Sequence, residues 1–240
     1  MLSPVAPEDR AAVTAAIMAA EPKAEQLGYI SEGKGDAHIC LHMAGGEFCG
    51  NACLSAAAYY LRENSLEEAS VRVAISGAEK NVTVDIRLEP DGSYTGFVYM
   101  PLPTGIGSFE GFILVSFPGI SHAIVPYSIS PEEAEEIIVP LCEKLDVDAL
   151  GLMLYNKKKA TLTPLVYVPG ANSLFWEQSC ASGTAALGAA IATQRRGNAS
   201  ISLSQPGGTL SVEARWNGKK VSSIRLGGKV EFLPEKFAEI

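Results

Sequence analysis

The stretch GGEFCGNACLSAAAYYL at residues 45–61 decides the fold, because a similar stretch, WEQSCASGTAALGAAIA, occurs at residues 176–192. In each stretch an acidic residue precedes a cysteine, a turn of small or polar residues follows, and an alanine-rich run comes next. Alanine has the highest helix propensity, so each stretch predicts a helix that begins beside its cysteine, at Cys49 and at Cys180. Two such stretches in one chain predict two similar halves.

The two cysteines are expected to be reactive. At the amino end of a helix, unpaired N–H groups and the helix dipole favour the thiolate and lower the thiol pKa. The residues that follow are small, so a substrate carboxylate could bind the backbone N–H groups there. The predicted binding residues after the two cysteines are Gly50, Asn51, Ala181, Ser182, Gly183 and Thr184.

Two thiols on opposite sides of one carbon atom suit one reaction in particular. One thiolate removes a proton from a stereocentre, and the opposite thiol returns a proton to the other face. The bound carboxylate would carry the developing negative charge. The pattern therefore predicts a racemase or epimerase in which Cys49 and Cys180 are the acid/base pair.

Outside the two stretches, short strands alternate with few helices. We expect helices at 7–20, 49–62 and 182–196, and one from Pro131 that Pro140 kinks or ends. We expect strands at 29–31, 37–43, 71–76, 82–88, 94–100, 112–117, 123–126, 150–154 and 163–168, and short strands at the end. Gly197 is expected to stop the last helix. The loop at 101–107 predicts a boundary between two halves, residues 1–104 and residues 105–240. In an alternative division, the final strand of the chain belongs to the first half. The fold class is α+β.

The composition excludes several classes of protein. The chain has 240 residues, 47% of them hydrophobic, which is too apolar for a disordered chain. A net charge of −8 with 19 Lys and Arg argues against a nucleic-acid partner, and no apolar run is long enough for a bilayer span. Five cysteines in a chain of this length indicate free thiols in a reducing compartment, with the cytoplasm as the expected location.

Three further signals compete with the two matched cysteines. His38, Cys40 and His42 alternate along one predicted strand, but this trio lacks a clear fourth metal ligand, and we predict no metal. Cys53 follows Cys49 by four positions, whereas redox pairs have two intervening residues, so we expect Cys53 in the core. His122 is expected at a strand end, where a histidine is more often structural.

The segments FCGNA and SCASGTA, with Gln205-Pro206-Gly207-Gly208, resemble the cofactor-independent amino-acid racemases and epimerases of the diaminopimelate epimerase fold. The resemblance covers almost the whole chain. It implies a two-base mechanism without pyridoxal phosphate, and two pseudo-symmetric halves, each a mixed or antiparallel sheet wrapped around a central helix. It also makes Glu25 an acidic residue at the active site or its gate. Glu47 and Glu177, the acidic residues before the cysteines, are further candidates for substrate binding.

The substrate follows from the same resemblance. Diaminopimelate epimerases hold a second carboxylate with an arginine before the second cysteine, but residues 174–180 contain no arginine. The family's Asn-Pro-His segment here reads Ile120-Ser121-His122. Diaminopimelate is therefore disfavoured. Further segments, among them GLMLYNKKKATLTPLVYVP at 151–169, resemble the histidine racemases of staphylopine-type metallophore biosynthesis. L- and D-histidine are therefore the expected substrates, with Tyr155, Phe175 or Trp176 as walls of the pocket.

Several alternatives stay open. Within the fold, the chain could be another epimerase, including a diaminopimelate epimerase. Outside it, the chain could be a thiol redox or metal-binding protein that uses Cys40, Cys49 and Cys53, or an inactive binding module. Family members begin with a strand and a Gly-Asn loop that nothing before Pro4 supplies, so the start of the sequence is expected to be truncated. A homodimer is the expected assembly.

Overall fold

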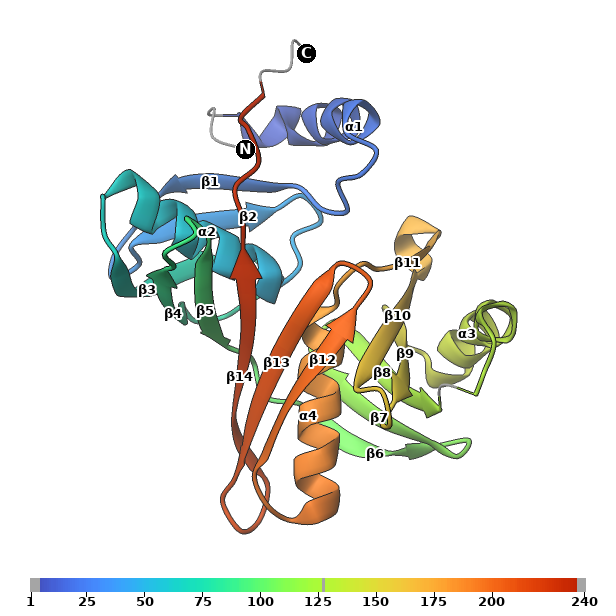
Figure 1. The fold of residues 1–240 in the computed structure, drawn as a ribbon. Coiled ribbons are helices and arrows are strands. Elements are labelled where there is room, and N and C mark those ends of the chain that lie inside the picture. Colours follow the sequence, from blue (N-terminus) through green and yellow to red (C-terminus); the bar gives the residue numbers. More distant parts are fainter. Residues whose placement is uncertain (1–4, 127, 237–240) are drawn as a thin grey trace. The chain divides into compact units, whose positions relative to one another are not determined.

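The computed structural model describes residues 5–126 and 128–236. These residues form two compact units, one of residues 5–98 and 228–236 and one of residues 99–126 and 128–227 (Figure 1). The sequence placed a division at residue 104, and the division into the halves 1–104 and 105–240 stays a prediction. The expectation about the segment before residue 5 lies outside the described residues.

The first unit places one helix against a sheet. Strands β1 (Gly28–Glu32), β2 (Ile39–Met43), β3 (Glu68–Ile75), β4 (Val82–Leu88) and β5 (Tyr94–Tyr99) pair in that order. All pairs from β1 to β5 are antiparallel except β2 and β3, which are parallel. A parallel pair needs a crossover, and α2 (Gly50–Glu63) supplies it and packs against β2, β3 and β4. The short helix η1 (Pro7–Asp9) and α1 (Arg10–Ala20) precede the sheet.

Small residues let α2 lie close to this sheet. Ala56, Ala57 and Ala58 are at most 1% exposed, and Leu54 and Leu61 of the same helix are buried as well. The helix begins at Gly50, one residue after Cys49, as the sequence predicted. The fold therefore fixes Cys49 at the amino end of a helix that is held by the core of its unit.

The second unit contains most of the strands, the last of which, β14, extends from it into the first unit at Gly228. They are β6 (Gly105–Phe109), β7 (Phe112–Phe117), β8 (Ile120–Pro126), β9 (Leu150–Asn156), β10 (Thr161–Val168), β11 (Ser173–Trp176), β12 (Ala199–Gln205), β13 (Gly208–Trp216) and β14 (Val221–Val230). They pair in the order β14-β13-β12-β10-β9-β8-β7-β6, with β11 added to β10. The parallel pairs β8–β9 and β10–β12 are joined by α3 (Pro131–Leu145) and α4 (Ala181–Arg195), with η2 (Pro169–Ala171) and β11 before α4.

Strands β8 to β10 are buried on both faces. Alternate side chains point to opposite faces of a strand, so Met153 packs in the cluster that contains residues of α4, and Leu152 in the cluster that contains residues of α3. Helix α4 is itself buried nearly all round, which is typical of a helix without a polar face. Its small residues let it pack against β12 and β13, beside which Figure 1 draws it.

Three details of the sequence prediction were wrong or incomplete. Pro140 does not end α3, which continues to Leu145, because Pro140 is on the exposed side while Ile138 and Leu141 pack in the core; the kink at Pro140 stays a prediction. Helix α4 ends at Arg195, and Arg196 rather than Gly197 takes the left-handed conformation, at φ 48°. The Gly197 N–H donates to the Ala192 carbonyl at 3.1 Å. Strands β6 and β11 were not predicted.

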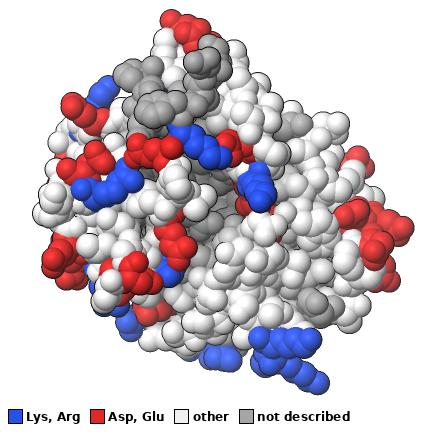
Figure 2. Space-filling view, turned by 45° about the horizontal axis from the view of Figure 1, so that its top comes forward, with Lys and Arg blue, Asp and Glu red and all other residues white. Residues whose placement is uncertain are grey.

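The fold class is mixed α/β, built on an extensive sheet. Within residues 5–126 and 128–236, no helix combines the length and the apolar character needed to cross a bilayer. On the face drawn in Figure 2, the described Lys and Arg side chains lie in small separate groups, several of them among acidic side chains. This distribution agrees with the net charge of −8 and does not suggest a nucleic-acid surface on that face.

Candidate active site

Cys49 is the N-cap residue of α2. Its backbone is extended, and its Sγ accepts the Ala52 N–H at 3.4 Å. The Cys49 thiol also donates to Gln26 Oε1 at 2.9 Å, and the residue is only 7% exposed. Gln26 lies in the segment before β1, so a neutral amide from outside the helix orients this thiol. The sequence contained a signal for this segment, since residues 25–30 resemble the histidine racemases, but it singled out Glu25 and not the contact of Gln26 with Cys49.

The turn after β3 positions the segment that leads to Cys49. Ser76 Oγ accepts the Met43 N–H at 2.9 Å and donates to the Glu47 carbonyl oxygen at 3.1 Å. Gly77 has φ +74°, and a Cβ on it would lie 2.3 Å from the Phe48 nitrogen. Only glycine fits this close approach of two backbones. Residues 76 and 77 therefore set where α2 begins.

Cys180 is the N-cap residue of α4 in the same way. Its Sγ accepts the Gly183 N–H at 3.3 Å, and it is 4% exposed. Its own N–H donates to the buried Gln205 Oε1 at 2.9 Å. Gln205 Nε2 donates to Thr184 Oγ1 at 2.7 Å, and Thr184 Oγ1 donates to the Cys180 carbonyl oxygen at 2.7 Å. The sequence contained a signal for Gln205, the Gln-Pro-Gly-Gly turn, but its hydrogen bonds were not predicted.

The predicted lowering of the thiol pKa is wrong for Cys180. Burial raises the pKa of Cys180 well above its ordinary value, and the charge of Glu177 and a hydrogen bond to it raise it further. The Gly183 N–H and the Ser182 hydroxyl lower it, but by less. Cys180 is therefore a thiol at neutral pH, because desolvation and a neighbouring carboxylate outweigh the helix terminus.

Most of the first-turn N–H groups of α4 are already used. The Gly183 N–H bonds Cys180 Sγ, and the Thr184 N–H donates to the Cys180 carbonyl oxygen at 3.0 Å. The first N–H groups of a helix have no intrahelical acceptor, which makes those of Ala181 and Ser182 the donors of this turn that remain for a ligand. The sequence had predicted this role for Gly183 and Thr184 as well.

The remaining predicted residues lie in different places. Gly50 and Asn51 form the first turn of α2, as Ala181 and Ser182 do in α4. Glu25 and Glu47 have exposed side chains in the first unit, and Glu177 is half-buried beside Cys180 in the second. The structure thus brings Glu177 to Cys180.

The predicted aromatic walls are not a group. Tyr155 packs in the core cluster that includes Cys180, but Trp176 packs in the other cluster and donates to Glu135 of α3 at 2.7 Å. Phe175 is 37% exposed. Trp176 is therefore tied to the opposite side of the sheet from Cys180.

His122 of β8 was considered structural and is fully buried. Its Nε2 lies 2.9 Å from Ser182 Oγ, and Ser182 Oγ lies 3.7 Å from Cys180 Sγ. Burial lowers the pKa of His122 to about 3, so the ring is neutral at physiological pH. The sequence showed this histidine but not its contact with Ser182, which comes from a segment 60 positions away.

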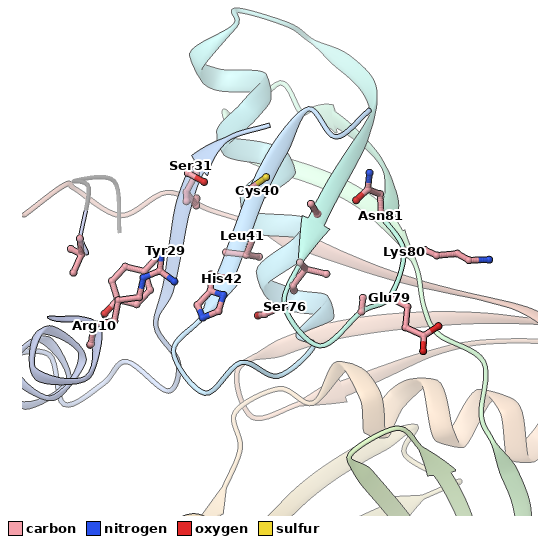
Figure 3. Close-up of a pocket in the computed structure, with 15 residues that line it drawn as sticks. Arg10, Tyr29, Ser31, Cys40, Leu41, His42, Ser76, Glu79, Lys80 and Asn81 are labelled. Atoms are coloured by element: carbon pink, nitrogen blue, oxygen red, sulfur yellow. Dashed lines mark hydrogen bonds between the residues drawn. The ribbon is translucent and has the colours of Figure 1, made fainter. Parts of the chain in front are cut away.

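Two pockets open on the first unit. The larger, about 420 Å³, is lined by side chains of the outer face of β1 and β2, including Tyr29, Cys40 and His42, with Arg10 of α1 beside Tyr29 (Figure 3). The second, about 380 Å³, is lined by Gln26, Asn51 and Ala52 among others. Gln26 and Ala52 are also the residues that hydrogen-bond Cys49 Sγ, so the second pocket lies nearer to the candidate site.

The geometry of the described residues does not favour a metal site at His38, Cys40 and His42 or a redox role for Cys53. His38 Nδ1 accepts the Arg72 N–H at 2.9 Å and its ring stacks near Tyr60, whereas Cys40 and His42 line the larger pocket. No three His, Cys, Asp or Glu side chains in the described part of the chain are grouped to hold a metal ion. Cys53 is a free thiol in the core, and burial raises its pKa well above the ordinary value, with a smaller effect from Cys49.

Known structures share this fold. A phenazine biosynthesis protein of the PhzF family from Bacillus anthracis superposes with a TM-score of 0.68 over 94% of this chain and 87% of its own, at 14% identity. A predicted epimerase from Pseudomonas aeruginosa gives a TM-score of 0.62 over 92% and 89%, at 15% identity. At these identities the likeness concerns the fold alone.

Sequence relatives are more specific. A histidine racemase of Fusobacterium nucleatum is 36% identical over 178 residues, which are 69% of this chain but only 65% of the relative's length. A histidine racemase of Staphylococcus aureus is 28% identical over 207 residues, 80% of this chain and 74% of the relative. The family model described as the histidine racemase CntK N-terminal domain matches residues 1–236. Because that match spans nearly the whole chain, this protein belongs to the histidine racemase CntK N-terminal domain family.

Proposed function

We propose that the protein is a cofactor-independent amino-acid racemase that interconverts L- and D-histidine. The observation that carries the proposal is the pair of matched caps, since Cys49 and Cys180 each cap a helix through Sγ, at Ala52 and at Gly183. The choice of histidine is supported by family membership and by relatives that are named histidine racemases.

In the proposed mechanism the two cysteines are the acid/base pair. One thiolate removes the α-proton, and the other thiol donates a proton to the opposite face of the α-carbon. The raised pKa of Cys180 favours its thiol form, so we propose it as the proton donor of the free enzyme. First-turn N–H groups of Gly50, Asn51, Ala181 and Ser182 would hold the α-carboxylate, which delocalises the charge of the carbanion. Both proton transfers use protein thiols, so the mechanism needs no pyridoxal phosphate.

Finer assignments belong to the same proposal. Each unit would be a sheet wrapped around one helix, α2 or α4, as in the diaminopimelate epimerase fold. Glu25, Glu47 and Glu177 would contribute to substrate binding, with Glu177 supported by its contact with Cys180. A homodimer, a cytoplasmic location supported by five free thiols, and a place in metallophore biosynthesis complete the proposal.

The test is exchange of the α-proton of L-histidine in D₂O, followed by proton NMR and chiral chromatography. We expect the parent protein to exchange the proton and to form D-histidine. Cys49→Ser and Cys180→Ser should each reduce exchange at least about 100-fold, because each removes one of the two proton-transfer groups. Cys142→Ala is the matched control, since Cys142 is a free buried cysteine of α3.

Other outcomes would redirect the proposal. Exchange of diaminopimelate or another amino acid in preference to histidine would retain the mechanism and reject the substrate. Histidine binding without exchange in the parent protein would indicate an inactive binding module. Exchange that survives both cysteine substitutions would overturn the two-thiol mechanism.

A further inference from the structure

The Cys180 thiol lies beside the Ser182 hydroxyl, and His122 contacts that hydroxyl on its other side. Ser182 Oγ lies 3.7 Å from Cys180 Sγ on one side and 2.9 Å from His122 Nε2 on the other. His122 is on β8 and Ser182 is in the first turn of α4, so the contact joins two elements that both pack in the same core cluster as Cys180. Three side chains thus form a chain of contacts that ends at the sulfur atom.

The second nitrogen of His122 restricts which proton the ring carries. Nδ1 is buried and has no hydrogen-bond partner among the described residues. It faces Gly151 of β9, where an added Cβ would lie 2.4 Å from Nδ1. A buried N–H without an acceptor is more costly and rarer than an acceptor without a donor. The neutral ring therefore carries its proton on Nε2 and donates it to Ser182 Oγ.

This tautomer determines where the Ser182 proton goes. A hydroxyl oxygen that accepts one hydrogen bond still has its own proton to donate. With Nε2–H directed at Ser182 Oγ, the Ser182 proton is directed away from the ring, and Cys180 Sγ is the acceptor on that side. Hydrogen bonds to an ionised group are stronger than those between neutral groups, so the contact gains strength when Cys180 becomes a thiolate.

We propose that Ser182 donates a hydrogen bond from its side chain to the Cys180 thiolate, and that His122 is the positioning residue that orients this hydroxyl. The inference rests on the proposed role of Cys180 as a proton-transfer group. After Cys180 gives its proton to the substrate carbon, the Ser182 O–H stabilises the thiolate, while His122 keeps its proton on Nε2. The hydrogen bond from Ser182 partly offsets the effects of burial and of the Glu177 charge, both of which disfavour the Cys180 thiolate.

The first unit has a different residue at the matching position. Asn51 stands two residues after Cys49, where Ser182 stands two residues after Cys180. The Cys49 thiol donates a hydrogen bond to Gln26 Oε1, whereas at Cys180 the Ser182 hydroxyl lies beside the sulfur. The inference therefore concerns Cys180 alone, and Cys49 serves as an internal reference in the same molecule.

The test measures the pH dependence of Cys180 alkylation by iodoacetamide in the full-length protein without substrate, with each cysteine quantified by peptide mass spectrometry. Among the described residues, the titratable groups near Cys180 are Glu177, which acts on the thiol directly, His122, which reaches it through Ser182, and Tyr155, which packs in the same cluster. Ser182→Ala should move the Cys180 profile up by about one pH unit, which slows alkylation about tenfold at a fixed pH on its rising limb. The Cys49 profile should not move.

Variants of His122 separate positioning from simple packing. His122→Leu fills the space but cannot donate, and should shift the Cys180 profile in the same direction as Ser182→Ala. His122→Gln can donate through Nε2 and should restore most of the parent profile. Ser121→Ala is the control on the same strand, because it removes a buried hydroxyl that bonds Ser116 and not Ser182. Circular dichroism and thermal unfolding establish that each variant is folded.

The outcomes distinguish this inference from the proposed function. A Cys180 profile that Ser182→Ala leaves unchanged would overturn the inference, whatever the enzyme does with histidine. An equal shift in Ser121→Ala would attribute the effect to packing of β8 and would also overturn it. If the profile shifts but Cys180→Ser still exchanges histidine, the hydrogen bond is real and the two-thiol racemase is wrong. If both hold, the pH profile of kcat for exchange should shift with Ser182→Ala while KM stays the same.

Discussion

The two helix caps look alike in sequence but differ in what surrounds them. Cys49 and Cys180 each accept an N–H three residues later, at 3.4 and 3.3 Å. Around Cys49, the exposed residue Gln26 accepts a hydrogen bond from the thiol. Around Cys180, the buried Gln205 holds the backbone, and Glu177, Ser182 and His122 act on the thiol. The difference teaches that one motif can be supported by a surface contact in one unit and by a buried network in the other.

The largest expected effect is on the free energy of unfolding, when Gln205 beside Cys180 and Gln26 beside Cys49 are each replaced. Gln205→Leu leaves the buried Cys180 N–H without its acceptor and removes the donor to Thr184 Oγ1, which keeps its bond to the Cys180 carbonyl oxygen. We expect it to lower the free energy of unfolding by about 3 kcal/mol, because an orphaned buried N–H costs about 1–3 kcal/mol and the Thr184 hydroxyl loses a further hydrogen bond. Gln26→Ala is the matched variant, and its exposed position predicts a change within about 0.5 kcal/mol. Urea denaturation measures both, and similar losses from the two variants would contradict the comparison.

The next effect concerns Gly183 and Ala52, whose N–H groups donate to the sulfur atoms of Cys180 and Cys49. A Cβ on Gly183 would lie 2.0 Å from Met153 Sδ, so Gly183→Ala forces the buried Met153 to move. We expect a loss of about 2 kcal/mol from this overpacking, and at least tenfold slower exchange, since the same Cβ lies 3.2 Å from Cys180 Sγ. The corresponding residue of α2 is Ala52, which already carries a Cβ.

The control for that prediction is Ala52→Gly. It should cost less than about 1 kcal/mol, the usual effect of glycine in a helix, and leave Cys49 capped. Thermal unfolding and the D₂O exchange assay give the two readouts. A Gly183→Ala protein as stable and active as Ala52→Gly would show that Met153 moves aside without cost.

The smallest expected effect is a loss of stability at acid pH in the second unit, which contains His122, and not in the first. His122 has a folded pKa of about 3 against an ordinary value of 6.5, so the unfolded state binds the proton first as the pH falls. Stability is therefore lost below about pH 6.5, by about 1.4 kcal/mol at pH 5.5, and the loss continues down to about pH 3. Hydrogen exchange of peptides from α4 should show this loss more strongly than peptides from α2.

His122→Gln provides the control for the acid effect, because glutamine has no charged form. Its α4 peptides should lose less protection between pH 7 and pH 5.5 than those of the parent. Equal losses in the parent and the variant would assign the acid sensitivity to other groups.

Much of the fold could be predicted from local patterns. The alanine-rich runs predicted α2 and α4 because helix propensity and small residues suit a buried helix, and Pro131 with its following acids predicted the start of α3. Pro140 showed the limit of this reasoning. A proline removes one backbone hydrogen bond, but the core contacts of Ile138 and Leu141 on either side of it keep the helix intact.

The candidate site divides in the same way. The sequence by itself determined that two cysteines stand at the starts of two helices, because a cap needs only its own residue and the next three. It could not determine the sign of the pKa shift at Cys180, which depends on burial and on Glu177. Nor could it reveal the hydrogen bonds of Gln26 and Gln205 to the cysteines or the approach of His122 to Ser182, which join distant segments. Burial and long-range hydrogen bonds exist only once the chain has folded, so tertiary structure alone decided them.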